Sequence, residues 1–457
     1  MITASIIQKS QLEGARRLDA EYYQPEYLAL QKNLEDTKSL KKWGELEGKF
    51  ITGPFGSEFN TDNYVQEGKY RYVRGKDVKD FFPTDEDNVY MPREDYERLK
   101  KYSLLEGDIL VSVVGTPGIG AIVDSKLPPA IFSCKSTVYR SKSINSFYFI
   151  AYLNSSYGRK LLERSVRGTV QTGLNIDDLR DLPVFLPNDT IQENIGVLVK
   201  NAKKTFDESK SLYTQAENLL LQELGLKDFK ADEDLYSIVN FSDIKSANRM
   251  DAEYFQPKYE KIISVSRKHG GKALGELVTI KKGFEPGADA YEDEGKLFIR
   301  VSSISKHELI DKDQKYINKK LYEELRKEYE PKKGEILLTK DASPGVAYVL
   351  DTAVDAIISS GILRLKLKEE INPDYLALCI NSVVGQMQVE RDAGGSVIAH
   401  WKPEQVKSLL VPILPKPTQE KIAKLVRESH EARKKAKELL EEAKRKVEEL
   451  IESKAIK

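Results

Sequence analysis

One eleven-residue stretch occurs twice in the sequence, about half the chain length apart. "RLDAEYYQPEY" fills residues 17–27, and "RMDAEYFQPKY" fills residues 249–259, with three differences. Further matches follow in the same order: "LLEGDILVSVVGTPGIGAIVD" at 104–124 aligns with "EPKKGEILLTKDASPGVAYVLD" at 330–351. A period this long is not that of a solenoid repeat. It predicts a duplicated domain arrangement with pseudo-twofold symmetry.

Each copy ends in a segment that is typical of a long helix. "DLPVFLPNDTIQENIGVLV" at 181–199 aligns with "SLLVPILPKPTQEKIAKLV" at 408–426. Apolar residues then recur at steps of three and four, which predicts amphipathic helices near the coiled-coil period over 190–224 and 418–453. Thr190 and Glu193 form a predicted capping box, and Gly225 a predicted stop.

The predicted helices are too long for one domain to cover, since each would measure about 50 Å at 1.5 Å per residue. The economical solution pairs them with each other, antiparallel, between two mixed domains. The alternative is two independent helical tails that recruit other proteins. Within the mixed regions, short β-rich runs bounded by Gly, Pro and Asp predict strands, and "SFYFIAYLNSSYGRKLLER" predicts one helix.

The predicted fold class is therefore α+β, with antiparallel strands in each mixed domain and two long antiparallel, coiled-coil-like helices between the domains. The predicted boundaries are a preface at 1–30 that packs near the C-terminal helix, a mixed domain at 31–187, a central helix at 188–228, a second preface at 229–260, a second mixed domain at 261–415 and a final helix at 416–457. We predict a structural role for the prefaces, with Tyr22, Tyr23 and Pro25 as packing groups and Asp19 and Glu21 as pairing or capping groups. Partner docking is the alternative role.

Composition favours a cytoplasmic protein of 457 residues that is 40% hydrophobic and 32% charged. The sequence shows no stretch that predicts a transmembrane helix and no signal peptide. Two cysteines cannot build a disulfide framework or a thiolate zinc site. The 72 basic and 72 acidic residues give zero net charge. The chain therefore lacks the excess of basic residues that is usual in a nucleic-acid-binding protein.

Motifs for catalysis are sparse. The loop at 113–123, "VVGTPGIGAIV", resembles a phosphate-binding loop, but such a loop needs a helix after its glycines. A strand is predicted there instead, so a Pro-Gly β-turn is the favoured interpretation. The four histidines show no metal-ligand spacing, and neither an amino-methyltransferase motif nor a repeated nuclease cluster is found. The pattern favours a chain without catalytic residues of its own.

Loops of the mixed domains interleave basic, amide and hydroxyl side chains. Arg can bind guanine, Asn or Gln can bind adenine, and Ser, Thr and Lys suit phosphates. These loops differ between the copies while the surrounding frame repeats, as expected for two readers of different targets. The candidate DNA-binding residues are Arg71, Arg74, Lys76, Lys79, Arg164, Arg167, Thr169, Gln171, Asn175, Arg300, Ser302, Lys306, Arg391, Ser396, His400 and Lys402.

The ordered double occurrence of these motifs resembles the specificity subunit of type I restriction–modification systems. The resemblance rests on "LLEGDILVSVVGTPG" at 104–118 and on "LPVFLPNDTIQENI" at 182–195. It implies a non-catalytic chain whose two target recognition domains each read one half of a split DNA sequence. It also implies partners: double-stranded DNA, two methyltransferase subunits, and motor–nuclease subunits that join through the complex. S-adenosylmethionine, ATP and Mg would then be bound by those partner subunits, with no cofactor in this chain.

Two other classes of function remain open from the residues alone. A self-contained restriction–methyltransferase enzyme would need S-adenosylmethionine and metal motifs. A coiled-coil structural adaptor would not need divergent basic loops.

Overall fold

The computed structural model describes residues 4–15, 17–127, 129–168, 172–230, 236–311, 313–393 and 400–455. Its contacts divide the chain into two units. Unit 1 contains Met1–Lys204 and Lys435–Lys457, and unit 2 contains Thr205–Lys434. Unit 1 therefore holds the first copy of the repeat with the end of the chain, and unit 2 holds the second copy.

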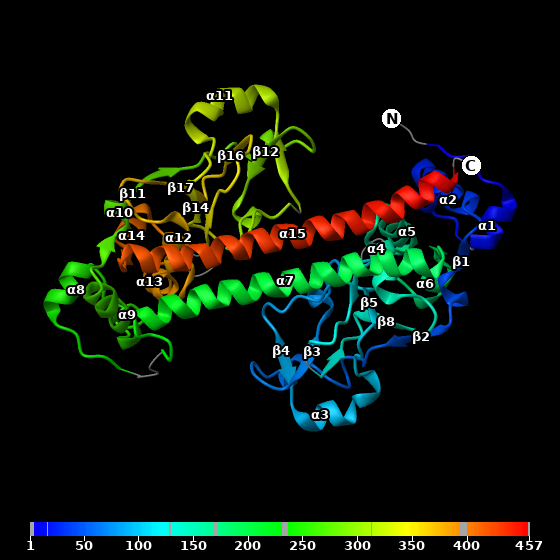
Figure 1. Ribbon diagram of the computed structural model, residues 1–457, viewed down its shortest axis with the longest axis horizontal. Helices are drawn as coiled ribbons and strands as arrows, with labels where there is room; N and C mark the ends of the chain where they lie inside the picture. Colours follow the sequence, from blue (N-terminus) through cyan, green and yellow to red (C-terminus); the bar gives the residue numbers. More distant parts are fainter. Residues whose placement is uncertain are drawn as a thin grey trace. The chain divides into compact units, whose positions relative to one another are not determined.

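Unit 1 combines three small sheets with helices (Figure 1). A four-stranded sheet has the order β2-β8-β5-β6, a three-stranded sheet the order β4-β3-β7, and β1 pairs with β9. The helices are α1 (Lys9–Ala15), α2 (Pro25–Asp36), α3 (Arg93–Arg98), α4 (Ser146–Asn154), α5 (Ser156–Ser165) and α6 (Ile176–Asp181). The strands are β1 (Leu40–Lys42), β2 (Gly48–Thr52), β3 (Tyr70–Val73), β4 (Val89–Met91), β5 (Ile109–Ser112), β6 (Gly120–Ile122), β7 (Ala130–Phe132), β8 (Ser136–Ser141) and β9 (Pro183–Phe185).

Unit 2 repeats the three sheets, as β11-β17-β14-β15, β13-β12-β16 and the pair β10-β18. Its helices are α8 (Phe241–Ala247), α9 (Pro257–Lys268), α10 (Leu274–Leu277), α11 (Lys319–Tyr329), α12 (Pro373–Asn381), α13 (Val383–Asp392) and α14 (Pro403–Ser408). Its strands are β10 (Lys272–Ala273), β11 (Val278–Lys282), β12 (Lys296–Ile299), β13 (Lys315–Ile317), β14 (Ile336–Thr339), β15 (Ala347–Val349), β16 (Ala356–Ile358), β17 (Ile362–Leu367) and β18 (Leu410–Val411). The predicted duplicated α+β fold is confirmed.

The strand pairing differs from the sequence prediction in one respect. Most strand pairs are antiparallel, as predicted, but β3 and β7 run parallel, as do β12 and β16. Each of these two strand pairs is joined by a long stretch of chain that contains other elements. A connection of that length permits parallel pairing, which a hairpin turn does not.

The central strand β5 is buried on both faces, which explains why its apolar run is continuous. Ile109 and Val111 enter the apolar cluster shared with α4 and α5, whereas Leu110 enters the cluster shared with β7. Successive strand side chains point to opposite faces of a sheet, so both faces of this sheet are covered. Strand β14 of unit 2 divides its side chains in the same way, with Leu337 on the opposite side from its neighbours.

The two longest helices are α7 (Asp189–Glu223) and α15 (Lys416–Ala455). In unit 1, Ile195 of α7 shares an apolar cluster with Val447 of α15. In unit 2, Leu220 of α7 shares a cluster with Ile422, and the hydroxyls of Ser209 and Ser429 lie 3.2 Å apart. The helices are antiparallel, because α7 passes from unit 1 to unit 2 and α15 passes from unit 2 to unit 1. No helix within the described ranges is long and apolar enough to cross a membrane.

Three helix boundaries can be compared with the boundaries predicted from the sequence. The capping side chain of α7 is Asn188, whose Oδ1 accepts from the Ile191 N–H at 3.0 Å, so the predicted capping box at Thr190 is wrong. The stop at Gly225 is confirmed, since this residue has a φ of 70°. The single predicted helix over 146–164 is broken at Ser155, which is extended and accepts a hydrogen bond from the Gly158 N–H at its side chain.

The repeated stretch "RxDAEYxQP" ties each preface to its own unit. Arg17 pairs with Asp19 and donates to the carbonyls of Ser165 and Val166, each at 3.1 Å. In unit 2, Arg249 pairs with Asp251 in the same way and donates to the carbonyl of Arg391 at 3.2 Å. The prolines of both stretches begin helices α2 and α9, where a missing N–H costs nothing.

Unit 2 holds a partly buried histidine, His307, against both long helices. The His307 ring lies 4.5 Å from the ring of Tyr213 on α7. Burial lowers the pKa of His307 to about 3, and the charges of Arg433 and Lys306 add to this effect. Besides the neutral Tyr213, the titratable groups that act on it from its own loop, α7 and α15 include Lys306, Lys210, His430 and Arg433. Nothing in this set stabilises a protonated imidazole.

Acidification should therefore destabilise unit 2. The His307 ring stays neutral in the folded unit, whereas an unfolded chain binds the proton near pH 6.5. Its contribution to stability is present above about pH 6.5 and is lost as the pH falls towards the folded pKa. The loss at pH 5 should be about 2 kcal/mol. Urea unfolding followed by Trp401 fluorescence, in a Trp43→Phe background, measures it for unit 2.

A His307→Phe variant provides the control for this pH dependence. It keeps an aromatic ring against Tyr213 but cannot bind a proton, so its loss of stability between pH 7 and pH 5 should be smaller. Some slope should persist, because burial also lowers the pKa of His430. Equal pH dependence in the two proteins would show that His307 is not responsible.

Candidate nucleic-acid interface

Five loops of unit 1 meet at one edge of its sheets. The Ser133 N–H donates to the Val73 carbonyl at 3.0 Å, and the Val113 N–H donates to the Lys135 carbonyl at 2.9 Å. Gly53 comes so close to this turn that an added Cβ would lie 2.6 Å from the backbone of Ser133, which explains the glycine. We define edge 1 as residues 53–58, 74–77, 113–118, 133–135, 166–168 and 172–175.

Unit 2 builds the same edge from the equivalent loops. The Ser359 N–H donates to the Ile299 carbonyl at 2.8 Å, and the Lys340 N–H donates to the Gly361 carbonyl at 2.9 Å. The Trp401 N–H donates to the Lys340 carbonyl at 2.8 Å, as the Leu174 N–H does to Val113 at 2.9 Å in unit 1. We define edge 2 as residues 283–287, 300–303, 340–345, 359–361 and 400–402.

The glycine-rich loop at 113–123 is a hairpin turn in edge 1. Strands β5 and β6 pair antiparallel on either side of it, so no helix follows the glycines and the predicted β-turn is confirmed. Gly115 and Gly118 both have a φ of 91°. At the position of Gly115, unit 2 places Ala342 with a φ of 61°, so the turn geometry persists there without the glycine.

Several predicted DNA-binding residues of unit 1 lie at edge 1. Arg74 forms a bidentate pair with the buried carboxylate of Asp77, and Lys76 pairs with Asp87 at 2.8 Å. Arg167 is exposed and pairs with Asp178 at 2.5 Å. Asn175 is also exposed. The basic groups of this edge are thus oriented by neighbouring carboxylates, which limits the number of conformations they sample.

Edge 2 carries its own set of predicted residues. Arg300 donates to the carbonyl of Asp313 at 2.7 Å, and His400 pairs with Asp341 at 2.8 Å. Ser302 and Lys402 are exposed. The frame is the same as at edge 1, but the side chains that it presents are different.

Other predicted residues lie away from the two edges or outside the described residues. Arg71 is buried in the middle of β3 and donates to the carbonyl of Thr84. Lys79 is exposed beyond edge 1, and the Lys306 ammonium lies 5.0 Å from the ring centre of Tyr213. The predictions for Thr169, Gln171 and Ser396 fall outside the described residues.

Arg164 and Arg391 are held by the prefaces. Arg164 is buried, stacks at 3.9 Å from the ring centre of Tyr22, and donates to the Tyr22 carbonyl at 2.8 Å. Arg391 takes the equivalent position, 4.8 Å from the ring centre of Tyr254. We therefore assign to both residues a role in the attachment of the prefaces.

Replacement of Arg164 should destabilise unit 1. The variant Arg164→Ala removes the stacking on Tyr22 and hydrogen bonds to the Tyr22 carbonyl and to Gln31. Loss of such charged hydrogen bonds costs about 1.5–3 kcal/mol. Urea unfolding followed by Trp43 fluorescence, in a Trp401→Phe background, reports unit 1. Arg93→Ala, an exposed position at the start of α3, is the control. Unchanged stability with weaker DNA binding would return Arg164 to the DNA interface.

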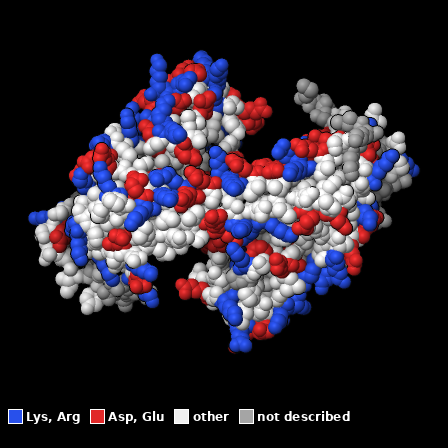
Figure 2. All heavy atoms as spheres, in the orientation of Figure 1, with Lys and Arg blue, Asp and Glu red and all other residues white. Residues whose placement is uncertain are grey.

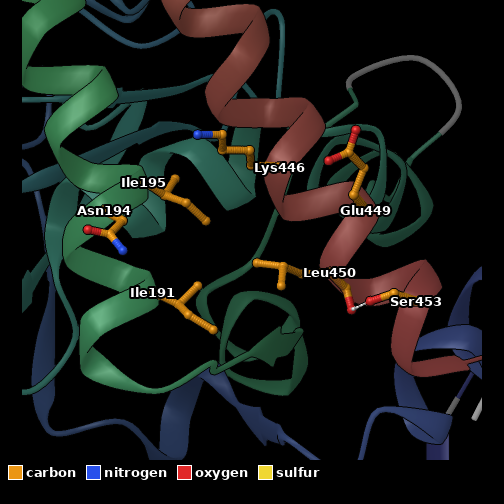
Figure 3. Close-up of a pocket in the computed structure, with 7 residues that line it drawn as sticks. All are labelled: Ile191, Asn194, Ile195, Lys446, Glu449, Leu450 and Ser453. Atoms are coloured by element: carbon orange, nitrogen blue, oxygen red, sulfur yellow. Dashed lines mark hydrogen bonds between the residues drawn. The ribbon is translucent and has the colours of Figure 1, made fainter.

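The surface charge, the metal-ligand groups and one cavity complete the description of the candidate site. Figure 2 shows basic side chains interspersed with acidic ones over the visible face. Among the described residues, no group of three or more His, Cys, Asp or Glu side chains could hold a metal ion. A cavity of about 390 Å³ lies between α7 and α15 in unit 1 (Figure 3). Its lining residues are Ile191, Asn194, Ile195, Lys446, Glu449, Leu450 and Ser453.

Comparison with known proteins identifies the family. A family model described as the type I restriction modification DNA specificity domain matches residues 54–218 and again residues 270–442. These two matches cover more than half of the chain and fall one on each copy of the repeat. No curated protein matches the sequence.

Solved structures of similar chains have low sequence identity. A type I restriction–modification S subunit from M. genitalium is 15% identical, with 91% of this chain and 95% of that chain covered and a TM-score of 0.43. An HsdS subunit from Thermoanaerobacter tengcongensis is 13% identical, with 91% and 96% covered and a TM-score of 0.29. Because the family model matches both halves, the chain belongs to the type I restriction–modification DNA specificity family and is a DNA specificity subunit.

Proposed function

We propose that each edge reads one half of a bipartite DNA sequence, edge 1 for unit 1 and edge 2 for unit 2. The observation that carries this proposal is the repetition of one loop frame with different side chains in the two units. A shared frame would present each reader to DNA in the same way, while the differing side chains would select different bases. The proposed recognition domains are residues 31–187 and 261–415.

The DNA contacts that we propose are the predicted residues at or near the edges. They combine cations for phosphates with amide, hydroxyl and imidazole groups for base edges. These residues are Arg74, Lys76, Lys79, Arg167, Asn175, Arg300, Ser302, His400 and Lys402.

The partners would be two methyltransferase subunits that dock on α7 and α15, and motor–nuclease subunits that join through the complex. The apolar groove between the helices in Figure 3, with Ile191, Ile195 and Leu450 in its wall, supports helix docking there. S-adenosylmethionine, ATP and Mg would be bound by these partners, and this chain would act without catalysis of its own in the cytoplasm. The zero net charge of this chain fits the proposal, since the partner subunits would share the contact with DNA.

Methyl transfer measured with and without the partners tests this proposal. The chain alone should not bind S-adenosylmethionine or methylate DNA, whereas the complex with methyltransferase subunits should methylate one set of sites. Native mass spectrometry should give two methyltransferase subunits for each specificity chain. Methylation by the chain alone would favour the self-contained enzyme, and methylation by the complex without sequence selection would favour the structural adaptor.

A further inference from the structure

Two apolar side chains of edge 1 are exposed in a way that the fold does not require. Phe55 is 66% exposed and Val114 is 45% exposed. Both lie in loops, where a polar residue would satisfy the fold equally well. Scattered single apolar residues at a surface need no explanation, but two on adjacent loops of a proposed reading edge call for one.

The β7–β8 turn contacts both of the loops that carry Phe55 and Val114. Phe55 comes two residues after Gly53, which packs directly on Ser133 of the turn. The Val114 N–H donates to the Lys135 carbonyl of the same turn at 3.3 Å. The backbone of one short turn therefore fixes where both apolar groups emerge.

Edge 2 places carboxylates at the two equivalent positions. Glu285 follows Gly283 as Phe55 follows Gly53, and both glycines pack on the equivalent turn of their own unit. Asp341 precedes Ala342 as Val114 precedes Gly115, and Asp341 accepts from His400 at 2.8 Å. Glu285 accepts a hydrogen bond from Ser360. Asp341 also pairs with Lys340 at 2.5 Å. The same frame thus carries hydrocarbon at one edge and carboxylates, held by neighbouring donors, at the other.

The chemistry of DNA indicates what each edge would select. In the major groove, the C5 methyl of thymine is the apolar group, and the amino groups of cytosine and adenine are the donors. Carboxylates accept from those donors but gain nothing from a methyl group. Arg74 and Lys76, on the neighbouring loop of edge 1, are suited to hold the adjacent phosphates.

We propose that Phe55 and Val114 contact thymine methyl groups in the half-site read by unit 1. This inference rests on the proposed function and deepens it, because it assigns a base chemistry to one edge. The two equivalent positions of unit 2 make no such contact, since Glu285 and Asp341 replace both apolar groups.

Deoxyuridine tests the contact, because it pairs like thymine but lacks the methyl group. The assembled complex is titrated with duplexes in which each thymine of one half-site is replaced in turn. Loss of one buried methyl group should weaken binding about fourfold. The complex with Phe55→Ala or Val114→Ala should bind thymine DNA more weakly and lose its response to deoxyuridine at one position. Replacements in the half-site of unit 2 should respond equally in all variants.

Leu105→Ala is the matched control, since Leu105 is 52% exposed but precedes β5, at the opposite end of that strand from Val114. It should keep the response of the unmodified complex to deoxyuridine. An unmodified complex that tolerates every replacement in the half-site of unit 1 would overturn the inference. The inference would also be overturned if Phe55→Ala and Val114→Ala weakened binding to the thymine duplex and to the deoxyuridine duplex by the same factor. That result would indicate side chains that insert between base pairs instead of contacting methyl groups. Failure of the proposed function would look different, since no duplex would then be bound selectively.

Discussion

Exchange of residues 31–187 for the corresponding domain of a related specificity chain will change one half of the methylated sequence and leave the other half intact. The physical reason is that each edge is built within its own unit, with its loops connected by hydrogen bonds inside that unit. The new edge would bring its own side chains, and edge 2 would keep its frame and its contacts. Mapping of methylated sites in cells that carry the chimera and its methyltransferase subunit measures the outcome.

The reciprocal exchange, of residues 261–415, is the control for this experiment. It should change the other half-site and preserve the first. The effect is expected to be all or none at the exchanged half, because each mismatched base pair costs about 1–3 kcal/mol. A chimera in which both halves change would show that the two readers are not independent.

Lengthening both long helices will shift the gap between the two half-sites without changing either half. Four residues inserted after Lys204 and four after Lys434 would lengthen α7 and α15 at the unit boundary. If these helices set the separation of the readers, as we propose, each insertion adds about 6 Å, close to two base pairs at about 3.4 Å each. The insertion also turns each helix by about 40° beyond a full turn, less than the twist of two base pairs.

Strain or DNA deformation must absorb that difference in twist, so we expect a shift of one to two base pairs in the non-specific gap. Insertion in α7 alone is the control. It should break the register of the apolar contacts that each unit makes between α7 and α15 and destabilise the protein. An active complex with both insertions and an unchanged gap would show that the helices do not set the distance.

The repeat carried most of the fold information in the sequence. Equivalent residues form equivalent contacts: Gln192 accepts from the Asn145 N–H at 3.2 Å and Gln419 accepts from the Asn372 N–H at 3.3 Å. A duplicated pattern of this kind predicts a duplicated fold, because the same contacts must be satisfied twice. Local signals were weaker, as the break at Ser155 shows. The "SFYFIAYLNSSYG" run predicts one helix. The chain instead turns at Ser155 and brings Gly158 against the Tyr152 carbonyl, so closely that an added Cβ would lie 2.1 Å from the carbonyl oxygen.

The candidate site was harder to predict than the fold. Arg164 and Arg391 have the composition of DNA-binding loops, yet their partners are the aromatic rings of the prefaces. Those partners lie more than a hundred residues away in the sequence, so residue type alone could not reveal them. The sequence prediction of DNA contacts did not include Phe55 and Val114, because apolar residues in a loop suggest packing against the core. A comparison with the equivalent residues of the second copy, Glu285 and Asp341, could have identified them. A position that must be apolar for packing would not be a carboxylate in the other copy.

The most direct test of the account is the set of methylated sites in cells that express the chain with its methyltransferase subunit. Two readers on one chain should give a single motif with two specific segments separated by a fixed non-specific gap, and no methylation of that motif in cells without this chain. One uninterrupted motif, or the same methylation in the absence of the chain, would contradict it.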